Sequence, residues 1–456
     1  MTRKEAKSLL HFKVLPDNSA SQIPRFQDSN VYCCMINRRK FLGNSFLAGT
    51  GVLTTSALSP MPSALPRQIE SLQPMTDGVV PITVSERKER IAKAQRLMER
   101  NKIDAIFLEG TASCFYFTGM RWGQSERTFG VVIPVSGSIA YVCPKFEEDR
   151  ARELIVKDFG DEVRCWEEDE SPYELIAGIV KDRGVRFRRI GIEERVRFFI
   201  ANGIKKAASG FDIVDATPVT AECRMYKSKA EIALMQHSSD VTIEAYKAAF
   251  ATIKPGMPQG ELSANIAAAF RKLSYSGGAM VLVGKYTAMP HGSIVPQTIQ
   301  EGDIVLVDGG TSVEGYASDI TRTIVVGKPT ARQSEIWNLE LAAQNAAFNV
   351  AKAGATCEKV DAAARAVIEN AGFGKNYKLP GLPHRTGHGI GLEGHEWTNF
   401  VKGNKTIIQP GMCFSDEPTI AIPGEFGIRL EDCLYIDTDG KPRFFSKQSK
   451  SIEEPF

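Results

Sequence analysis

The sequence lacks any apolar tract long enough to cross a bilayer, which takes about 20 residues. It also lacks a strong charge of either sign, because 56 basic and 54 acidic residues give a formal net charge of +2. A nearly neutral chain does not have the basic surface typical of proteins that bind nucleic acid or membrane surfaces. We therefore expect no membrane span and no nucleic-acid partner.

Paired cysteine motifs are absent as well. The nine cysteines are scattered apart from the adjacent Cys33 and Cys34, and none forms a C-x-x-C pair. This argues against a zinc ribbon and a thioredoxin-like redox site. The composition is 43% hydrophobic and 24% charged over 456 residues, which is typical of a globular protein with two or three domains.

A short segment near the N-terminus resembles a twin-arginine export signal. Residues 37–43 read Asn-Arg-Arg-Lys-Phe-Leu-Gly, and a weakly apolar run and small residues follow, as in signal peptides. The signal begins near Met35, so we expect either that Met35 is the true start or that residues 1–34 are a leader, with signal and linker over 35–82. The expected location is periplasmic or otherwise exported. The alternative is a cytoplasmic enzyme with a chance Arg-Arg pair.

The remaining sequence divides into two regions. Residues 83–220 alternate short apolar runs with helical patterns, which predicts an α/β domain with a mixed sheet. Residues 221–456 contain two helices followed by strands, and then the same order again. Each half of this second region begins with a capping pattern, at 228–231 and 330–333. The predicted helices cover 85–100, 145–157, 173–183, 228–253, 260–273, 330–352 and 357–370. The predicted strands cover 105–108, 130–134, 139–142, 279–285, 303–307, 317–326, 412–415, 418–422 and 428–436.

Two acids flank a predicted hairpin in the first half. Asp308 ends the apolar run 303–307 and precedes two glycines, which permit a tight turn and close approach to a ligand. Asp319 follows eleven residues later within the β-rich run 317–326. An Asp after a strand is often a turn residue, but an Asp within a strand needs a partner if buried. A hairpin would return Asp319 to Asp308.

Three of the six histidines fall within twelve positions of the second half: His384, His388 and His395. Four glycines between residues 387 and 394 argue against a helix here, so we expect an extended or looped segment close to a site. A single histidine is often an ordinary surface or core residue. Three in a Gly-rich segment favour a functional site.

Two glutamates complete the candidate set. Glu417 follows an apolar run, and alternation within 428–436 places Arg429 and Glu431 on the same face of a strand. The alternative is a surface ion pair between these two side chains. The apolar sequence around them favours a buried carboxylate.

The chain resembles the pita-bread metallopeptidases (aminopeptidase P, Xaa-Pro dipeptidase, methionine aminopeptidase and their non-metal relative creatinase). It carries their ligand pattern complete and in order: Asp308, Asp319, His388, Glu417 and Glu431. Residues 85–220 are similar to the creatinase-type N-terminal domain. This domain and the run 422–432 favour the proline-specific branch, aminopeptidase P or Xaa-Pro dipeptidase. Thr419 and Ala421 depart from the family's usual residues, which affects the expectation for fine specificity.

The resemblance implies an α/β (α+β) fold, with a creatinase-type domain over 83–220 and a pita-bread catalytic domain over 221–456. It also implies two divalent metal ions, manganese first, with cobalt, iron or zinc as alternatives. In this family pattern, Asp319 and Glu431 would bridge the two ions. Asp308 would bind one ion, and His388 and Glu417 would bind the other.

Further roles are implied by the same resemblance. Glu417 would carry the proton of the nucleophilic water to the leaving nitrogen. His291 would bind substrate or assist the leaving group, although it is alternatively an ordinary loop histidine. His395 would bind the substrate by donating to its carbonyl oxygen. His384 and Arg429 would bind the proline-side carboxylate or orient the metal ligands.

The implied reaction is hydrolysis of the bond between the first residue and proline, in dipeptides or short peptides, by a homodimer or homotetramer. One alternative is a creatinase- or ectoine-hydrolase-like enzyme that cleaves a small C–N compound. Another is a catalytically inactive binding module. Creatinase lacks the full metal set and inactive relatives usually lose ligands, so five intact ligand positions count against both alternatives.

Overall fold

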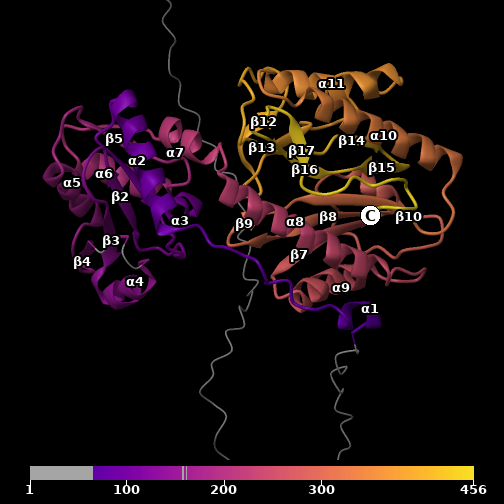
Figure 1. Ribbon diagram of the computed structural model, residues 1–456, viewed down its shortest axis with the longest axis horizontal. Helices are drawn as coiled ribbons and strands as arrows, with labels where there is room; N and C mark the ends of the chain where they lie inside the picture. Colours follow the sequence, from indigo (N-terminus) through magenta and orange to yellow (C-terminus); the bar gives the residue numbers. More distant parts are fainter. Residues whose placement is uncertain (1–64, 157–158, 161) are drawn as a thin grey trace, which may run out of the picture. The chain divides into compact units, whose positions relative to one another are not determined.

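The computed structural model describes residues 65–156, 159–160 and 162–456 (Figure 1). The expected leader over 1–34 and the twin-arginine signal lie outside the described residues. In the part of the chain that the structure describes, no helix is both long and apolar enough to cross a membrane.

The first domain is built on a six-stranded sheet with the order β4-β3-β2-β1-β5-β6. Strand β1 (Ala105–Glu109) pairs antiparallel with β2 (Gly130–Pro134) and parallel with β5 (Arg189–Ile192), so the sheet is mixed as predicted. The other strands are β3 (Ala140–Pro144), β4 (Val163–Trp166) and β6 (Asp212–Asp215). Every residue of β1, β2 and β3 is buried, as expected for strands covered on both faces.

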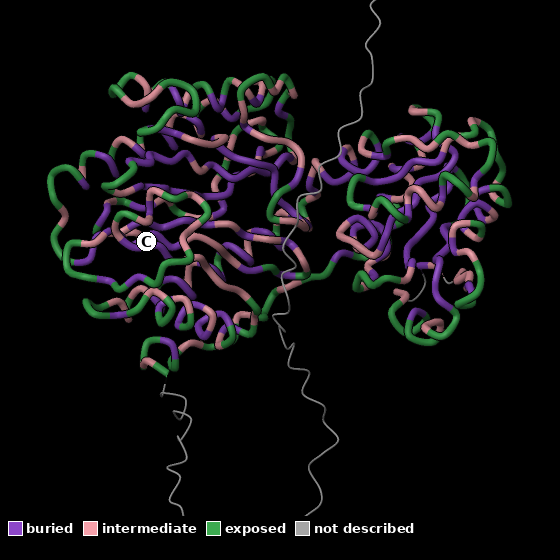
Figure 2. The backbone as a smooth tube through the Cα atoms, turned by 180° about the vertical axis from the view of Figure 1, so that it is seen from behind, coloured by how far each residue is buried: buried purple, intermediate pink, exposed green. Residues whose placement is uncertain are grey.

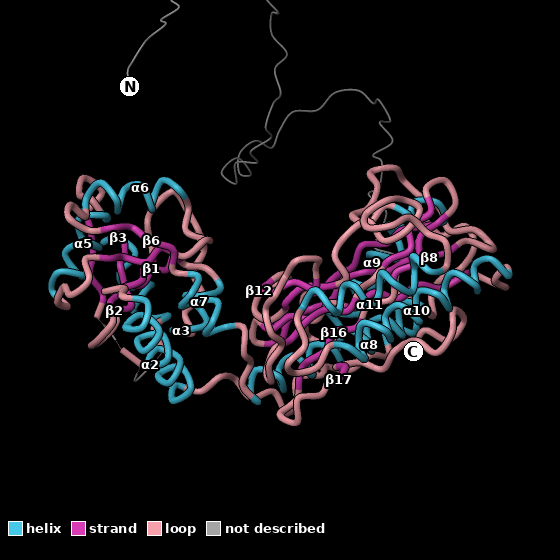
Figure 3. Tube along the Cα trace, turned by 90° about the horizontal axis from the view of Figure 1, so that it is seen from above, coloured by secondary structure: helices cyan, strands magenta, loops and turns pink. Residues whose placement is uncertain are grey.

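Helices cover both faces of this sheet, and Figure 3 shows α2 and α6 on opposite sides of the strands. One face carries α2 (Val84–Asn101), α3 (Ala112–Thr118), the 3-10 turn η1 (Lys145–Glu147) with α4 (Glu148–Leu154), and α7 (Thr217–Arg224). The other face carries α5 (Pro172–Asp182) and α6 (Phe198–Ala207). The helix predicted over 145–157 is therefore shorter and begins as a 3-10 turn.

The second domain contains the predicted order of two helices and then strands, twice (Figure 1). The first half consists of α8 (Lys229–Phe250), α9 (Gln259–Lys272), β7 (Gly277–Val283), the 3-10 turn η2 (Gly284–Ala288), β8 (Ile304–Val313), β9 (Tyr316–Ala317) and β10 (Ile320–Val325). The second half consists of α10 (Ala331–Val350), α11 (Cys357–Asn370), β11 (Gly387–Gly389), β12 (Glu396–Phe400), β13 (Cys413–Asp416), β14 (Thr419–Ile422), β15 (Phe426–Arg429), β16 (Asp432–Ile436) and β17 (Pro442–Phe444). The sheet orders are β10-β8-β7, β12-β11-β13-β16-β17 and β14-β15.

Capping boxes begin the first helix of each half. The Ser228 hydroxyl accepts from the backbone N–H of Glu231, whose carboxylate accepts from the N–H of Ser228. Thr330 and Gln333 make the same reciprocal pair at the start of α10. Both predicted helix starts are confirmed, because each pair satisfies backbone donors that have no partner within the helix.

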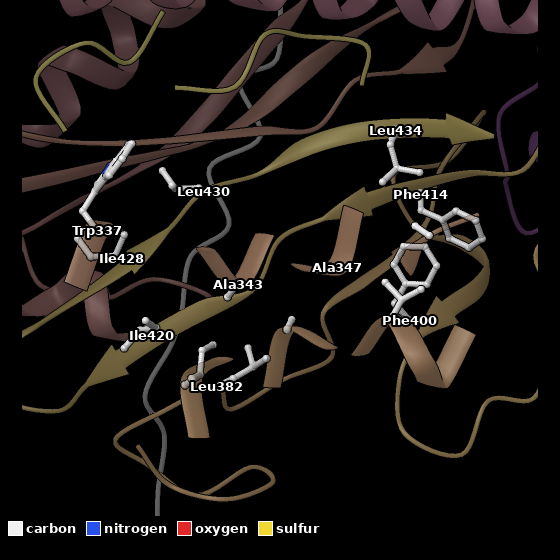
Figure 4. Packing of buried hydrophobic residues seen from close by; sticks show 14 of the residues in the cluster. Trp337, Ala343, Ala347, Leu382, Phe400, Phe414, Ile420, Ile428, Leu430 and Leu434 are labelled. Atoms are coloured by element: carbon white, nitrogen blue, oxygen red, sulfur yellow. The ribbon is translucent and has the colours of Figure 1, made fainter. Parts of the chain in front are cut away.

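The hydrophobic cores of the second domain lie between its helices and its strands. Helices α8 and α9 pack on β7 and β8, while α10 and α11 pack on β13 to β16. Figure 4 shows the second of these cores, in which the rings of Phe400 and Phe414 stack 4.1 Å apart. Figure 2 shows the strands as mostly buried and the exposed residues on loops and outer helix faces. The strand faces turned away from the helices are thus free to form a site.

Two expectations about boundaries differ from the structure. The segment predicted as signal and linker over 35–82 includes α1 (Arg67–Glu70), whose fully buried Ile69 packs with α8 and α9. The Met75 N–H also donates to the Leu273 carbonyl at 3.1 Å. The domain boundary expected at 220 falls inside α7, whose Cys223 belongs to the core of the first domain. Apolar residues in both segments pack into the hydrophobic cores of the two domains, and the composition of these segments does not indicate such contacts.

Replacing Phe400 with Ala is expected to lower the free energy of unfolding by about 3–5 kcal/mol, because it removes a fully buried ring and leaves a cavity. Urea unfolding followed by circular dichroism measures the change. The control is Phe198→Ala, whose side chain is 81% exposed, and it should change stability by less than about 0.5 kcal/mol. Equal losses in both variants would contradict the assignment of this core.

Candidate metal centre

One cavity of about 440 Å³ brings together all the site residues predicted from the sequence. Its five candidate metal ligands come from strands of both halves or from the residues beside them. Asp308 lies in β8, Asp319 immediately before β10, His388 in β11, Glu417 immediately after β13, and Glu431 immediately before β16. The other predicted residues that line it are His291, His384, His395 and Arg429.

The glycines after Asp308 serve close strand packing instead of a turn. Strand β8 continues through Gly309 and Gly310 to Val313, so Asp308 lies within the strand and not at its end. A Cβ atom on Gly309 would collide with the carbonyl of Gly278, and one on Gly310 with the carbonyl of Ser318. The predicted hairpin is present, since β8 and β10 pair antiparallel.

Thr321 joins the two halves at the centre. Its backbone N–H donates to the Glu431 carbonyl at 3.3 Å, and the Glu431 N–H donates to the Thr321 carbonyl at 3.2 Å. The Thr321 hydroxyl lies 2.9 Å from Oδ1 of Asp308 and 2.7 Å from Oε2 of Glu431. One buried hydroxyl therefore contacts acids from both halves.

The strand predicted over 428–436 is broken at this bridge. Strand β15 ends at Arg429 and β16 begins at Asp432, and the two belong to different sheets. Arg429 and Glu431 nevertheless both line the cavity, as the alternation indicated. No ion pair joins them in the described structure; Arg429 pairs with Asp308 instead.

His388 faces the acids through one ring nitrogen. Its Nε2 lies 3.2 Å from Oε1 of Glu417 and 3.9 Å from Oδ2 of Asp319. Its Nδ1 lies 3.1 Å from the Gly389 carbonyl, and the Ser415 hydroxyl accepts from its backbone N–H at 3.0 Å. An anchored Nδ1 orients the ring and leaves Nε2 as the nitrogen that can bind a metal.

The acids of the centre fit divalent cations. Ligand atoms of Asp319, His388 and Glu431 all lie within 4.8 Å of one another, and the buried Oε1 of Glu431 has no hydrogen-bond partner. Burial and the charge of Asp308 raise the pKa of Asp319 to about 7. Burial and the charge of Asp319 raise the pKa of Glu431 well above its ordinary value. Such crowding is what a bound cation relieves, and carboxylates with one imidazole suit a hard or borderline metal.

Arg429 contacts the acids and not open solvent. Its side chain is buried, with one terminal nitrogen donating to Oδ2 of Asp308 and Nε donating to the Thr321 hydroxyl at 3.2 Å. The other terminal nitrogen donates to the Pro290 carbonyl at 3.3 Å. Of the two roles expected for Arg429, these contacts match the orientation of metal ligands.

The three remaining histidines have different surroundings. His384 is partly buried, with Nδ1 lying 2.7 Å from the Arg385 carbonyl and Nε2 lying 3.1 Å from the Thr419 hydroxyl; burial lowers its pKa. His395 is exposed, and its ring packs edge-on against His388 at 4.1 Å; partial desolvation by neighbouring groups and the charge of His388 lower its pKa. His291 is an exposed loop residue beyond η2.

The sequence did not indicate the residues that support these groups. Thr321 and Ser415 each stand two positions from a candidate ligand in a strand pattern, and this spacing is the signal that could have found them. The pair Asp361 and Arg365 left no such signal. It lies on α11, where Asp361 accepts from the Thr386 hydroxyl at 2.8 Å and Arg365 donates to the carbonyl of His384.

Two protein-family models match the chain. Metallopeptidase family M24 matches residues 233–438, and the Creatinase/Prolidase N-terminal domain matches residues 90–226. The first range contains all five candidate metal ligands.

Two related proteins and a solved structure match this chain over most of their lengths. The chain is 35% identical to an uncharacterized peptidase of Schizosaccharomyces pombe, over 84% of this chain and 86% of that protein. It is 32% identical to the Xaa-Pro dipeptidase of Lactobacillus helveticus, over 77% of this chain and 95% of that protein. The crystal structure of dipeptidase PepE from Mycobacterium ulcerans superposes with a TM-score of 0.76 at 30% identity, covering 82% of this chain and 99% of that one.

Manganese binding and the Glu431→Gln variant test the centre. Mn²⁺ at about 100 times its Kd is expected to stabilise the wild-type protein by about 2.7 kcal/mol, and the variant by much less. In the metal-free protein the variant is expected to be at least as stable as wild type, because a crowded buried carboxyl is removed. Thermal unfolding with and without Mn²⁺ measures both effects.

The control is Glu425→Gln, an exposed acid in the same domain, which should respond to Mn²⁺ like the wild type. Bound manganese per chain, determined by elemental analysis after dialysis, provides a second measurement. A wild-type response from Glu431→Gln would rule out Glu431 as a ligand.

Proposed function

Since the chain belongs to metallopeptidase family M24, we propose that it is a metal-dependent dipeptidase that hydrolyses the bond between a first residue and proline. The observation that carries this proposal is one cavity in which the imidazole of His388 meets four carboxylates from both halves of the domain. The enzyme named Xaa-Pro dipeptidase in Lactobacillus helveticus supports the proline-specific assignment.

Five side chains would hold two divalent ions in this proposal: Asp308, Asp319, His388, Glu417 and Glu431. When bound, the ions supply a water of lowered pKa as the nucleophile and polarise the peptide carbonyl. Manganese is the metal we propose first, with cobalt, iron or zinc as alternatives, because availability and geometry select among metals that such ligands accept.

Glu417 is the proposed proton carrier. Burial raises the pKa of Glu417, but the hydrogen bond and charge of His388 outweigh burial and lower it to about 2. Its carboxylate is therefore ionised near neutral pH and can accept the proton of the attacking water. Transfer of that proton to the proline nitrogen would allow the amine to leave.

The histidines of the cavity are proposed to bind the peptide. His395, neutral near pH 7 because its pKa is lowered, would donate its ring N–H to the carbonyl oxygen as negative charge develops there. His291 would contact the substrate beside the leaving nitrogen. His384 would face the proline-side carboxylate. Arg429 would act on the metal ligands, since its side chain donates to Asp308 and to Thr321.

The proposed activity is tested with a panel of Xaa-Pro dipeptides, Xaa-Pro tripeptides and creatine, with Mn²⁺ present. The wild type should hydrolyse Xaa-Pro dipeptides. Glu417→Gln should lower kcat by about 10²- to 10⁴-fold because the proton carrier is lost, and Asp308→Ala should abolish turnover. Both variants should keep the wild-type circular dichroism spectrum.

Turnover of creatine without turnover of any Xaa-Pro peptide would favour the creatinase-like alternative. Metal binding without hydrolysis of any compound would favour a binding module. Comparison of dipeptides with tripeptides measures the length of substrate that is accepted.

We also propose export through the twin-arginine route, supported by the Arg38-Arg39 pair and the apolar run after it.

The enzyme is further proposed to act as a homodimer or homotetramer, which light scattering after gel filtration would measure.

A C-terminally tagged chain is expected in the exported fraction with its N-terminus removed. Replacing Arg38 and Arg39 with Lys should retain it, uncleaved, in the cytoplasm, because the route reads the arginine pair. Cell fractionation and the mass of the purified protein measure the outcome. Full-length wild-type protein found solely in the cytoplasm would refute export.

A further inference from the structure

Residues 390–395 form the loop between β11 and β12 that carries His395, and a buried carboxylate at its end holds it in place. Glu396 begins β12 immediately after His395, and Glu396 pairs with Gly389 of β11 across the hairpin. Its side chain is 1% exposed, whereas His395 itself is exposed. Oε1 of Glu396 accepts from the backbone N–H of Glu393 at 3.2 Å, so the carboxylate ties the start of β12 to the middle of the loop.

Two buried cations hold this carboxylate. Lys227 Nζ lies 2.9 Å from Oε2 of Glu396, and a terminal nitrogen of Arg224 donates to Oε1. Burial raises the pKa of Glu396, but Lys227 and Arg224 outweigh burial and lower it to about 2, so the group is ionised at neutral pH. A Cβ atom on Gly391 would lie 2.6 Å from Oε2 of Glu396 and 2.8 Å from Cε of Lys227. The loop is therefore packed directly on the pair.

The same arginine reaches the first domain. Arg224 ends α7 and donates to the Ser113 hydroxyl of α3 at 2.9 Å, while Ser113 donates to Glu193. Arg224 also lies 2.8 Å from Oε2 of Glu393, within the loop. Helix α3 is thus connected through Arg224 to both acids of the His395 loop.

We propose that Glu396 is a positioning residue for His395. Through its contacts with Ser113 and Glu396, Arg224 couples the position of this histidine to the first domain. The inference rests on the substrate-binding role proposed above for His395. Glu396 contacts neither the cavity nor a candidate metal ligand among the described residues. It acts by fixing the loop that holds His395 edge-on against His388. Because a misplacement of about 1 Å can cost 10²-fold in rate, loosening this loop should lower kcat.

The test compares Glu396→Gln, His395→Ala and the double variant. Glu396→Gln keeps the size of the side chain and removes its charge. It is expected to lower kcat about 10- to 100-fold while the manganese content and the circular dichroism spectrum stay as in wild type. In the His395→Ala background the same change is expected to have almost no effect on kcat, because the residue through which Glu396 acts is gone.

The matched control is Glu231→Gln. Glu231 is also a buried acid, 3.4 Å from Arg90 of the first domain, and it makes no contact with the His395 loop. Glu231→Gln should lower the free energy of unfolding by about as much as Glu396→Gln does, and it should retain the wild-type kcat. Lys227→Arg, which preserves a cation beside Glu396, should retain most activity.

Hydrogen–deuterium exchange over residues 389–396 tests the positioning directly and does not depend on the role of His395. Exchange should become at least about tenfold faster in Glu396→Gln and stay unchanged in Glu231→Gln. Unchanged exchange, or an equal loss of kcat with and without His395, would overturn the inference. If His395→Ala is fully active while the exchange result holds, the proposed role of His395 fails and the structural link stands.

Discussion

The bridge between Thr321 and Glu431 is the contact on which the metal centre depends. Each residue donates to and accepts from the backbone of the other, and each belongs to a different half of the second domain. This exchange fixes the register of one half against the other. In this register, Asp308 and Asp319 from one half and Glu431 from the other line the same cavity.

Such a centre lowers the stability of the folded protein when no metal ion is bound. Several buried carboxylates repel one another, and Arg429 offsets part of their charge through its contact with Asp308. Two acids behind the cavity, Glu340 and Asp416, are fully buried without hydrogen-bond partners, and burial raises the pKa of both well above the ordinary value. A raised pKa favours the uncharged form of both groups, which reduces the negative charge that neighbours the metal ligands. Capped helices and apolar cores on the opposite strand faces supply the stability that the site costs.

The features that the sequence revealed are those with a local signal. Capping boxes, the hairpin around Asp308 and Asp319, and the extended Gly-rich segment depend on residues close together in the chain, so their patterns predicted the structure. The expected ligand position of Glu431 came from strand alternation joined to family resemblance, and that of Glu417 from its place after an apolar run joined to the same resemblance. The structure brings these residues into one cavity.

The features that the sequence did not reveal depend on distant partners. Glu396 meets Lys227 across 169 positions, and Thr321 meets Glu431 across 110. No local pattern marks such pairs, because their placement follows from the packing of whole elements. The break in the strand predicted over 428–436 was hidden for a related reason. Alternation of side chains persists through Leu430 and Glu431 although the backbone passes from one sheet to another.

The packing of Ile69 limits how far the N-terminus of the folded enzyme can be shortened. Ile69 is fully buried against α8 and α9, and Met75 is tied to Leu273 and to the ring nitrogen of His237. A truncation that removes residues beyond Arg67 would delete α1. Apolar surface on α8 and α9, which carry no catalytic group but belong to the domain that holds the site, would then be exposed. The segment that contains α1 and precedes the first domain therefore acts as part of the catalytic domain's core, although it lies outside that domain's own stretch of sequence.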